Sequence, residues 1–230
     1  MLGGYIRVRR ERMKHLYIVR HGQTEWNAVQ RMQGRLDSPL TEDGRQHAFQ
    51  NGTLIKELGG VEQLCVSPAG RAMETAFIMN SLTQCNIEYF DELQERDSGV
   101  WSGMTVSEIA AQFPQAWATR EDDPYNFRPP NGENLQDMLV RVHEILDALY
   151  ASDFESVALV THGVMSKVIL KFYLDLNEVE TGRLRHPNDL VYRLTFGAQE
   201  IETEHYIAGG PGQKGLLYND LGPVVRTQSE

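Results

Sequence analysis

The chain has 230 residues, of which 32 are acidic and 22 are basic, so its formal net charge is −10. A chain of this length usually forms one domain, and folding at this size buries enough apolar surface that no disulfide or metal is needed to hold the fold together. The acidic balance disfavours a nucleic acid or an anionic membrane as a partner, and no apolar run approaches the roughly 18 residues that span a bilayer.

The two ends differ in composition from the rest of the chain. Residues 1–12 carry four arginines and one glutamate, and Met13 directly after them is a plausible natural start. We therefore expect residues 1–12 to be a disordered or non-native extension. A Gly/Pro-rich tail begins at Gly209 and predicts a loop over residues 209–230. A single domain is expected over residues 13–208.

Between these ends, short runs rich in β-forming residues alternate with apolar residues at helical spacing. In chain order, the pattern predicts a strand over 16–19, a helix over 41–58, a strand over 63–66, a helix over 69–80, a strand over 87–90, a helix over 135–149, a strand over 157–160, a helix over 164–174, and strands over 190–196 and 201–206. The last two strands are expected to form a hairpin across Gly197. Such alternation predicts an α/β fold with helices on both faces of one sheet.

Two of the predicted strands end in the same way. The first is followed by Arg20-His21-Gly22, and the strand over 157–160 is followed by Thr161-His162-Gly163. If these strands are neighbours, both imidazoles lie at the carboxyl edge of the sheet, where ligands of α/β proteins bind. Arg71 follows a third strand, at the start of a helix. Arg20 and Arg71 could together hold a phosphate through paired N–H donors.

This set of residues meets the needs of phosphoryl transfer. Hydrolysis of a phosphate monoester needs an acceleration that approaches ~10²¹, whereas one well-placed donor supplies about 3 kcal/mol, so several cations and a nucleophile must act together. A neutral histidine can attack phosphorus, and nearby arginines favour the neutral form. Four carboxylates could protonate the leaving oxygen, and the pattern alone does not choose among Asp91, Glu92, Glu95 and Asp97.

An ordered series of motifs makes the interpretation more specific. They are Arg20-His21-Gly22-Gln23-Thr24-Glu25-Trp26-Asn27, Gln33-Gly34-Arg35-Leu36-Asp37-Ser38-Pro39-Leu40-Thr41, Ser67-Pro68 with Arg71-Ala72 and Thr75-Ala76, Leu93-Gln94-Glu95 with Gly99, Trp101 and Gly103, Gly132-Glu133-Asn134, and Thr161-His162-Gly163. In this order, over about residues 14 to 205, the sequence resembles the phosphoglycerate mutase-like branch of the histidine phosphatase superfamily.

The resemblance implies a three-layer α/β/α sandwich with a mostly parallel central sheet, and chemistry that needs no metal or other cofactor. It implies that His21 is the phosphorylated nucleophile and that Glu95 protonates the leaving group. Arg20, Arg71 and His162 would bind the phosphoryl group with help from Asn27. The resemblance also places four residues beside the substrate, and these are Thr24, Gln33, Gly34 and Gly163.

The resemblance alone does not distinguish a phosphatase, which transfers the phosphoryl group to water, from a mutase, which transfers it between substrates. Mutases that depend on 2,3-bisphosphoglycerate carry a long basic insertion between the acid and the Gly-Glu motif. Here that segment is short, and its cations are only Arg96, Arg120 and Arg128. This favours a phosphatase that acts on a small phosphorylated metabolite. The alternatives are such a mutase and a catalytically silent phosphate-binding module.

A different mechanism is suggested by the spacing of Cys65 and Arg71, which matches the C-x5-R pattern of cysteine-dependent phosphatases. Pro68 argues against it, because proline removes an amide from the cradle that such a thiolate needs. Two cysteines form no disulfide framework, which favours a cytoplasmic location. The sequence leaves the oligomeric state open between a monomer and a homodimer.

Overall fold

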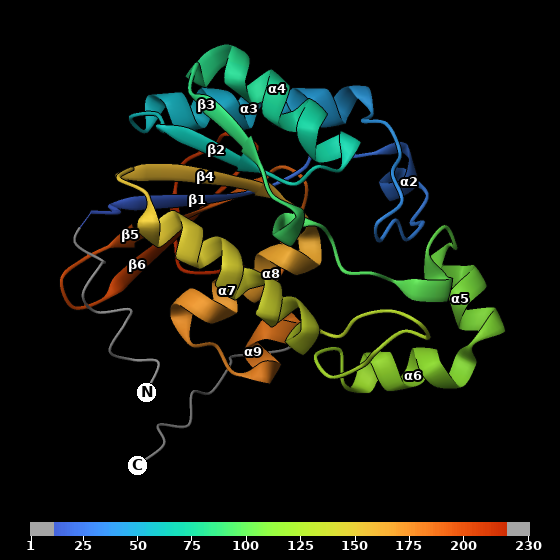
Figure 1. The fold of residues 1–230 in the computed structure, drawn as a ribbon. Coiled ribbons are helices and arrows are strands. Elements are labelled where there is room, and N and C mark those ends of the chain that lie inside the picture. The colour runs from blue at the N-terminus through green and yellow to red at the C-terminus, as the bar shows by residue number, and fades with distance from the viewer. Residues whose placement is uncertain (1–11, 220–230) are drawn as a thin grey trace.

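A computed structural model describes residues 12–219, so residues 1–11 of the predicted extension and residues 220–230 of the tail lie outside the described part. One seven-stranded sheet runs through the molecule in the order β3-β2-β4-β1-β5-β6-β7 (Figure 1). Its strands are β1 (His15–Arg20), β2 (Gln63–Val66), β3 (Asn86–Tyr89), β4 (Ser156–Thr161), β5 (Leu190–Phe196), β6 (Ile201–Ile207) and β7 (Gln213–Lys214). The first four strands are parallel to one another, and β5, β6 and β7 continue the sheet in antiparallel order.

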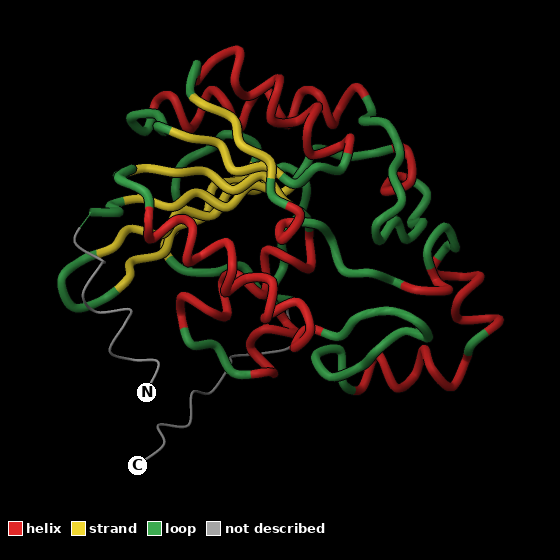
Figure 2. Tube along the Cα trace, in the orientation of Figure 1, coloured by secondary structure: helices red, strands yellow, loops and turns green. Residues whose placement is uncertain are grey.

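Helices cover both faces of the sheet, as Figure 2 shows. They are α2 (Glu25–Ala28), α3 (Glu42–Glu57), α4 (Gly70–Thr83), α5 (Val106–Gln112), α6 (Pro114–Asp122), α7 (Leu135–Ala151), α8 (Gly163–Leu174) and α9 (Glu178–Arg183), with short 3-10 turns at Asp91–Leu93 and Gly99–Trp101. Helices α3 and α4 lie on one face, and α7 and α8 lie on the other. The predicted α/β/α sandwich is therefore confirmed, with a sheet that is parallel at its centre.

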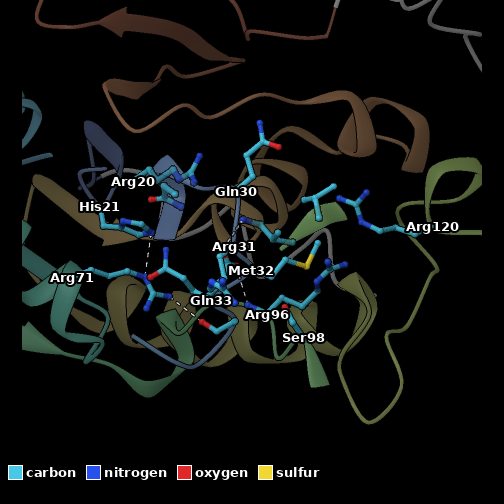
Figure 3. A pocket seen from close by; sticks show the side chains of 15 residues that line it. Arg20, His21, Gln30, Arg31, Met32, Gln33, Arg71, Arg96, Ser98 and Arg120 are labelled. Carbon is cyan, nitrogen blue, oxygen red and sulfur yellow. Dashed lines mark hydrogen bonds between the residues drawn. The ribbon is translucent and has the colours of Figure 1, made fainter. Parts of the chain in front are cut away.

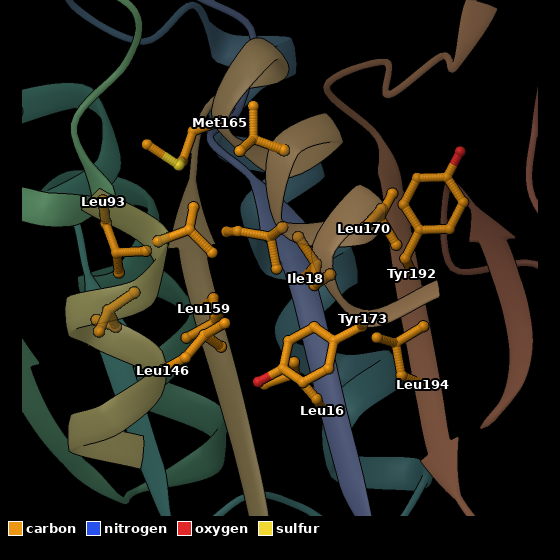
Figure 4. Packing of buried hydrophobic residues seen from close by; sticks show 14 of the residues in the cluster. Leu16, Ile18, Leu93, Leu146, Leu159, Met165, Leu170, Tyr173, Tyr192 and Leu194 are labelled. Carbon is orange, nitrogen blue, oxygen red and sulfur yellow. The ribbon is translucent and has the colours of Figure 1, made fainter. Parts of the chain in front are cut away.

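Alternation along the central strand builds the two halves of the core. Successive side chains of a strand point to opposite faces of the sheet. Leu16 and Ile18 therefore pack with α7 and α8, whereas Tyr17 and Val19 pack with α3 and α4. Figure 4 shows the first of these clusters, with Ile18 beside Leu159 of the neighbouring strand. The four central side chains of β1, Leu16 to Val19, are fully buried, which is why this part of the strand reads as a continuous apolar run.

Every predicted strand and helix is present, including the hairpin of β5 and β6. The pattern analysis missed α2, α5, α6, α9 and β7. Three of these helices, α2, α5 and α9, begin with capping boxes, in which Thr24 pairs with Asn27, Thr105 with Glu108 and Asn177 with Glu180. This signal could have found them from the sequence. In the segment expected as tail, residues 213–214 pair with β6, and Tyr218 forms a bridge with Leu184.

The sheet order places the chemical residues. Strand β4 lies between β1 and β2, with Arg20 opposite Thr161 and Val66 opposite Val160. The carboxyl ends of three neighbouring strands therefore meet at one edge. No helix within residues 12–219 is long and apolar enough to cross a membrane.

Candidate active site

The imidazole of His21 is held by two hydrogen bonds that leave one of its nitrogens unprotonated. Its Nδ1 lies 2.8 Å from the carbonyl oxygen of Gly22, which can only accept a hydrogen bond. Its Nε2 lies 3.2 Å from Nε of Arg71, which can only donate. The two partners together assign the proton to Nδ1 and leave the lone pair on Nε2. His21 is therefore in the tautomer that a nucleophile requires.

The surroundings of His21 also keep it neutral. Burial lowers its pKa well below the ordinary value of 6.5, and the positive charges of Arg71 and then Arg20 lower it further. The same three causes lower the pKa of His162, with His21 as an additional neighbour. Burial and the neighbouring charges both disfavour the imidazolium form, so both imidazoles stay unprotonated to more acidic pH than an ordinary histidine.

We expect ring NMR signals of His21 and His162 to stay those of neutral imidazoles as the free enzyme is titrated from pH 8 to about 5.5. A lowered pKa moves protonation to more acidic pH, so the step that an ordinary histidine shows near 6.5 is absent. His21→Gln and His162→Gln would assign the two signals. A midpoint near pH 6.5 for either ring would contradict the expectation.

Arg71 is fixed by the loop that precedes α3. Its side chain is 1% exposed, and its guanidinium donates to the carbonyl oxygens of Gly34 (2.9 Å) and Leu36 (2.7 Å) and to Oδ1 of Asp37 (2.8 Å). These bonds leave its Nε–H pointing at His21. Asp37 was part of a matching motif, but its role as the partner of Arg71 was not foreseen.

The second histidine lies directly beside the first. The ring centres of His21 and His162 are 5.2 Å apart, at an interplanar angle of 61°. Nε2 of His162 lies 2.7 Å from Oγ of Ser67, at the end of β2. Its Nδ1 is buried and has no hydrogen-bond partner within the described residues. Because buried polar atoms are normally paired, this nitrogen indicates a place where a ligand supplies the partner.

Arg20 adds a second guanidinium on the other side of His21. One of its terminal nitrogens donates to the carbonyl oxygen of His186 at 2.7 Å, and its buried Nε has no partner among residues 12–219. Gly163 lets this side chain lie close to the start of α8, since a Cβ there would be 3.3 Å from Cζ of Arg20. His186 is itself buried, with Nδ1 at 2.7 Å from Oγ of Ser166.

Glu95 joins the site to the N-terminus of α8. Its carboxylate accepts hydrogen bonds from the backbone N–H groups of Val164 (3.1 Å) and Met165 (3.2 Å), in the first turn of that helix, and from Arg96 N (2.9 Å). A helix N-terminus stabilises negative charge, so it holds this side chain in place. Of the four candidate carboxylates, Glu95 is the one that lines the pocket.

A pocket of about 250 Å³, shown in Figure 3, is lined by Arg20, His21, Arg71 and Glu95. His162 lies beside His21 and is not among the lining residues. Among residues 12–219, five arginines line the pocket, and Glu95 is the only acidic lining residue. The five are Arg20, Arg31, Arg71, Arg96 and Arg120. A strongly cationic pocket in a chain of net charge −10 can attract an anion, because exposed charges elsewhere are screened beyond about 8 to 10 Å at physiological salt.

The remaining predicted residues divide into two groups. Asn27, Gln33 and Gly34 line the pocket. Thr24 does not, because it is fully buried and its hydroxyl accepts hydrogen bonds from the side chain of Gln33 (2.8 Å) and the backbone of Asn27 (3.1 Å). Thr24 therefore stabilises the conformation of the loop and does not line the pocket. Asn188, which the pattern analysis missed, donates to the carbonyl oxygen of His21 at 2.8 Å.

The cysteine mechanism is not supported by the surroundings of Cys65. Its side chain is fully buried within β2, and burial raises the pKa of the thiol to about 12. A reactive cysteine needs a lowered pKa and access to the substrate. Within residues 12–219, no group of three or more His, Cys, Asp or Glu side chains is arranged to hold a metal ion.

A model of the histidine phosphatase superfamily (branch 1) matches residues 16–208. Among curated proteins, a probable phosphoglycerate mutase GpmB from Erwinia tasmaniensis is 33% identical over 183 residues, which cover 79% of this chain and 85% of that protein.

Solved structures show the same likeness. A mycobacterial glucosyl-3-phosphoglycerate phosphatase in complex with VO3 is 27% identical with a TM-score of 0.75, covering 86% of this chain and all of that one. YhfR from Bacillus stearothermophilus is 30% identical with a TM-score of 0.73, covering 85% of this chain and 96% of that one.

Proposed function

Because the chain belongs to the histidine phosphatase superfamily (branch 1), we propose that it is a phosphomonoester hydrolase that works through a phosphohistidine at His21. The observation that carries this proposal is the tautomer of His21. Its unprotonated Nε2 faces a buried group of cations, beside a second neutral imidazole. This is the arrangement that a nitrogen nucleophile needs to attack a phosphoryl dianion.

In the first step, Nε2 of His21 forms a bond to phosphorus while the bond from phosphorus to the ester oxygen breaks. Arg20, Arg71 and Nδ1 of His162 stabilise the charge on the phosphoryl oxygens. Glu95, in its protonated form, transfers a proton to the leaving oxygen, which departs as an alcohol. The phosphoryl group is then held as a phosphohistidine.

In the second step, Glu95 accepts a proton from a water molecule as its oxygen attacks phosphorus. The bond between phosphorus and Nε2 breaks, inorganic phosphate leaves, and both His21 and Glu95 return to their starting states. No metal is required for either step in this proposal. Both cysteines are free thiols, and we place the reaction in the cytoplasm on that ground.

Phosphoryl transfer between substrates remains the alternative, since curated relatives carry the name of a probable phosphoglycerate mutase. Between Glu95 and Gly132 the chain carries only three cations, which by itself disfavours a mutase. The pocket also takes Arg31 and Arg20 from outside that segment, so scarcity of charge no longer separates the two activities. We favour hydrolysis because the long insertion of the mutases is absent from this chain.

We expect purified protein, dialysed against a chelator, to release inorganic phosphate from small phosphomonoesters and to carry acid-labile radiolabel when quenched during turnover. A panel of phosphorylated metabolites, with conversion of 3- to 2-phosphoglycerate measured in parallel, tests the assignment. Interconversion faster than phosphate release would establish the mutase instead. Phosphate binding with no turnover of any ester would establish a silent binding module, and activity that returned only with added metal would overturn the mechanism.

A further inference from the structure

Two of the pocket arginines, Arg71 and Arg20, are held in different ways. Arg71 is fixed by hydrogen bonds to three residues of the loop that precedes α3. Within residues 12–219, the guanidinium of Arg20 has a single hydrogen bond, in which a terminal nitrogen donates to the carbonyl oxygen of His186 at 2.7 Å. The direction in which Arg20 enters the pocket of Figure 3 therefore depends on where that carbonyl group lies.

The side chain of His186 holds this carbonyl group in place. The residue is only 5% exposed, and its two ring nitrogens contact different elements. Nε2 lies 2.9 Å from the carbonyl oxygen of Leu190 in β5, and Nδ1 lies 2.7 Å from Oγ of Ser166 in α8. The ring also packs edge-on against Tyr192, with ring centres 5.0 Å apart. His186 thus joins β5 to α8 at the point where Arg20 needs its acceptor.

The ring does this without adding a positive charge. A carbonyl oxygen only accepts hydrogen bonds, so the contact with Leu190 places a proton on Nε2 of His186. Burial lowers the pKa of His186 to about 3, against the raising effect of the bond to Leu190, and the charge of Arg20 lowers it further. Nδ1 therefore accepts from the hydroxyl of Ser166, at the shorter of that hydroxyl's two contacts. A neutral ring does not repel the guanidinium beside it.

The backbone around His186 is restrained as well. Pro187 follows it in the chain, and a residue before proline is largely limited to extended conformations. The N–H of Leu190 donates to the carbonyl oxygen of Pro187 at 3.3 Å, which closes a turn. From the same turn, Asn188 donates to the carbonyl oxygen of His21 at 2.8 Å. The turn that supplies the acceptor for the arginine therefore also contacts the proposed nucleophile.

We propose that His186 is a positioning residue for the reaction, because its ring fixes the carbonyl group that orients Arg20 toward the phosphoryl group. This inference rests on the proposed function, in which Arg20 binds that group. His186 does not line the pocket, so it acts on the substrate only through Arg20. Its loss should therefore cost almost nothing once the guanidinium of Arg20 has been removed.

A double-mutant cycle tests this dependence. We expect His186→Ala to lower kcat/KM by about tenfold to a hundredfold, since a displaced binding group loses much of its effect. Arg20→Gln removes the charged donor itself and should cost about 10²- to 10³-fold. When Arg20 is already glutamine, His186→Ala should cost less than about twofold. The same cost of His186→Ala in both backgrounds would overturn the proposal.

His205 offers a matched control for a purely structural effect. It is also 5% exposed, its Nδ1 lies 2.9 Å from the carbonyl oxygen of Gly215, and its ring centre lies 6.3 Å from that of Tyr192. It does not line the pocket. His205→Ala should lower the melting temperature and leave kcat/KM unchanged. A loss of activity as large as that of His186→Ala would overturn the proposal.

A conservative variant covers the case in which His186→Ala does not fold. His186→Gln keeps a side-chain N–H as a donor for the carbonyl oxygen of Leu190. We expect it to fold and to lose less activity than the alanine variant, again only while Arg20 is present. A loss in His186→Gln that persists at full size in the Arg20→Gln background would contradict the role.

Binding of inorganic phosphate separates this inference from the proposed function. If no ester is hydrolysed, calorimetric titration with phosphate replaces kcat/KM in the same cycle. Arg20→Gln should weaken binding by about tenfold or more, because a hydrogen bond to a charged group contributes on that scale. Weaker binding in His186→Ala that disappears in the Arg20→Gln background would support the positioning role without the chemistry. Unchanged phosphate affinity in His186→Ala would overturn it.

Discussion

Replacing His21 with alanine is expected to lower kcat by about four orders of magnitude or more and to abolish the acid-labile label. The reason is that the variant keeps Arg20 and Arg71 but has no Nε2 to form the proposed covalent bond, and loss of a nucleophile is usually the most damaging single change in such sites. Single-turnover quench experiments with radiolabelled substrate measure both effects. Binding of inorganic phosphate should survive in the variant.

The control for His21→Ala is His143→Ala, which removes an imidazole that packs edge-on against Phe172, away from the pocket lining. That variant should retain both turnover and label. Thermal unfolding of each variant shows whether the fold is intact. A His21→Ala enzyme that still becomes labelled, with kcat within tenfold of the parent, would refute the phosphohistidine.

The second large effect is expected from Glu95→Gln, which should slow hydrolysis of alkyl phosphates by about 10²- to 10⁴-fold. Glutamine cannot transfer a proton to the leaving oxygen. A nitrophenyl ester, whose leaving group departs without protonation, should be slowed much less in the step that forms the phosphoenzyme. Burst kinetics with both esters separate this step from the water attack that follows.

Glu95 also accepts hydrogen bonds from the first turn of α8, so a structural effect must be distinguished from the chemical one. Glutamine retains one carbonyl oxygen as an acceptor for that turn, and the melting temperature should fall only slightly. Losses of equal size for alkyl and nitrophenyl esters would argue against Glu95 as the acid and for a role in holding α8.

The sequence predicts the strands and the long helices well because these elements carry strong local signals. Strand β1 is apolar at its four central positions because these are buried on both faces of the sheet, and α7 shows apolar residues at helical spacing along its length. Helices α5 and α6 are short and bury few side chains, so periodicity does not reveal them. The start of α5 is nevertheless marked by the capping box of Thr105 and Glu108, and the start of α6 by Pro114 in its first turn.

Within the site, His21, His162 and Arg71 could be brought together from strand endings alone, because parallel neighbours share an edge. The supporting contacts could not be foreseen in this way. Ser67 and Asp37 act on His162 and Arg71 through hydrogen bonds that depend on how loops fold back. For Thr24, the motif predicts a residue beside the substrate, but the side chain is hydrogen-bonded within the loop. A motif alone does not distinguish a residue that contacts substrate from one that stabilises the loop.

The position of β1 in the sheet has a consequence for how the protein is made. His15 pairs with Ser156 on one side and with Thr195 on the other, so both neighbours of this strand are synthesised roughly 140 to 180 residues later. Until then the apolar run Leu16–Val19 has no sheet to join, and contacts of such long sequence separation form slowly. His21, which directly follows β1, is therefore made long before β4 and β5, and the edge of the sheet at which it lies is completed only after them. Recovery of enzymatic turnover after dilution from denaturant would therefore report the end of folding rather than its start.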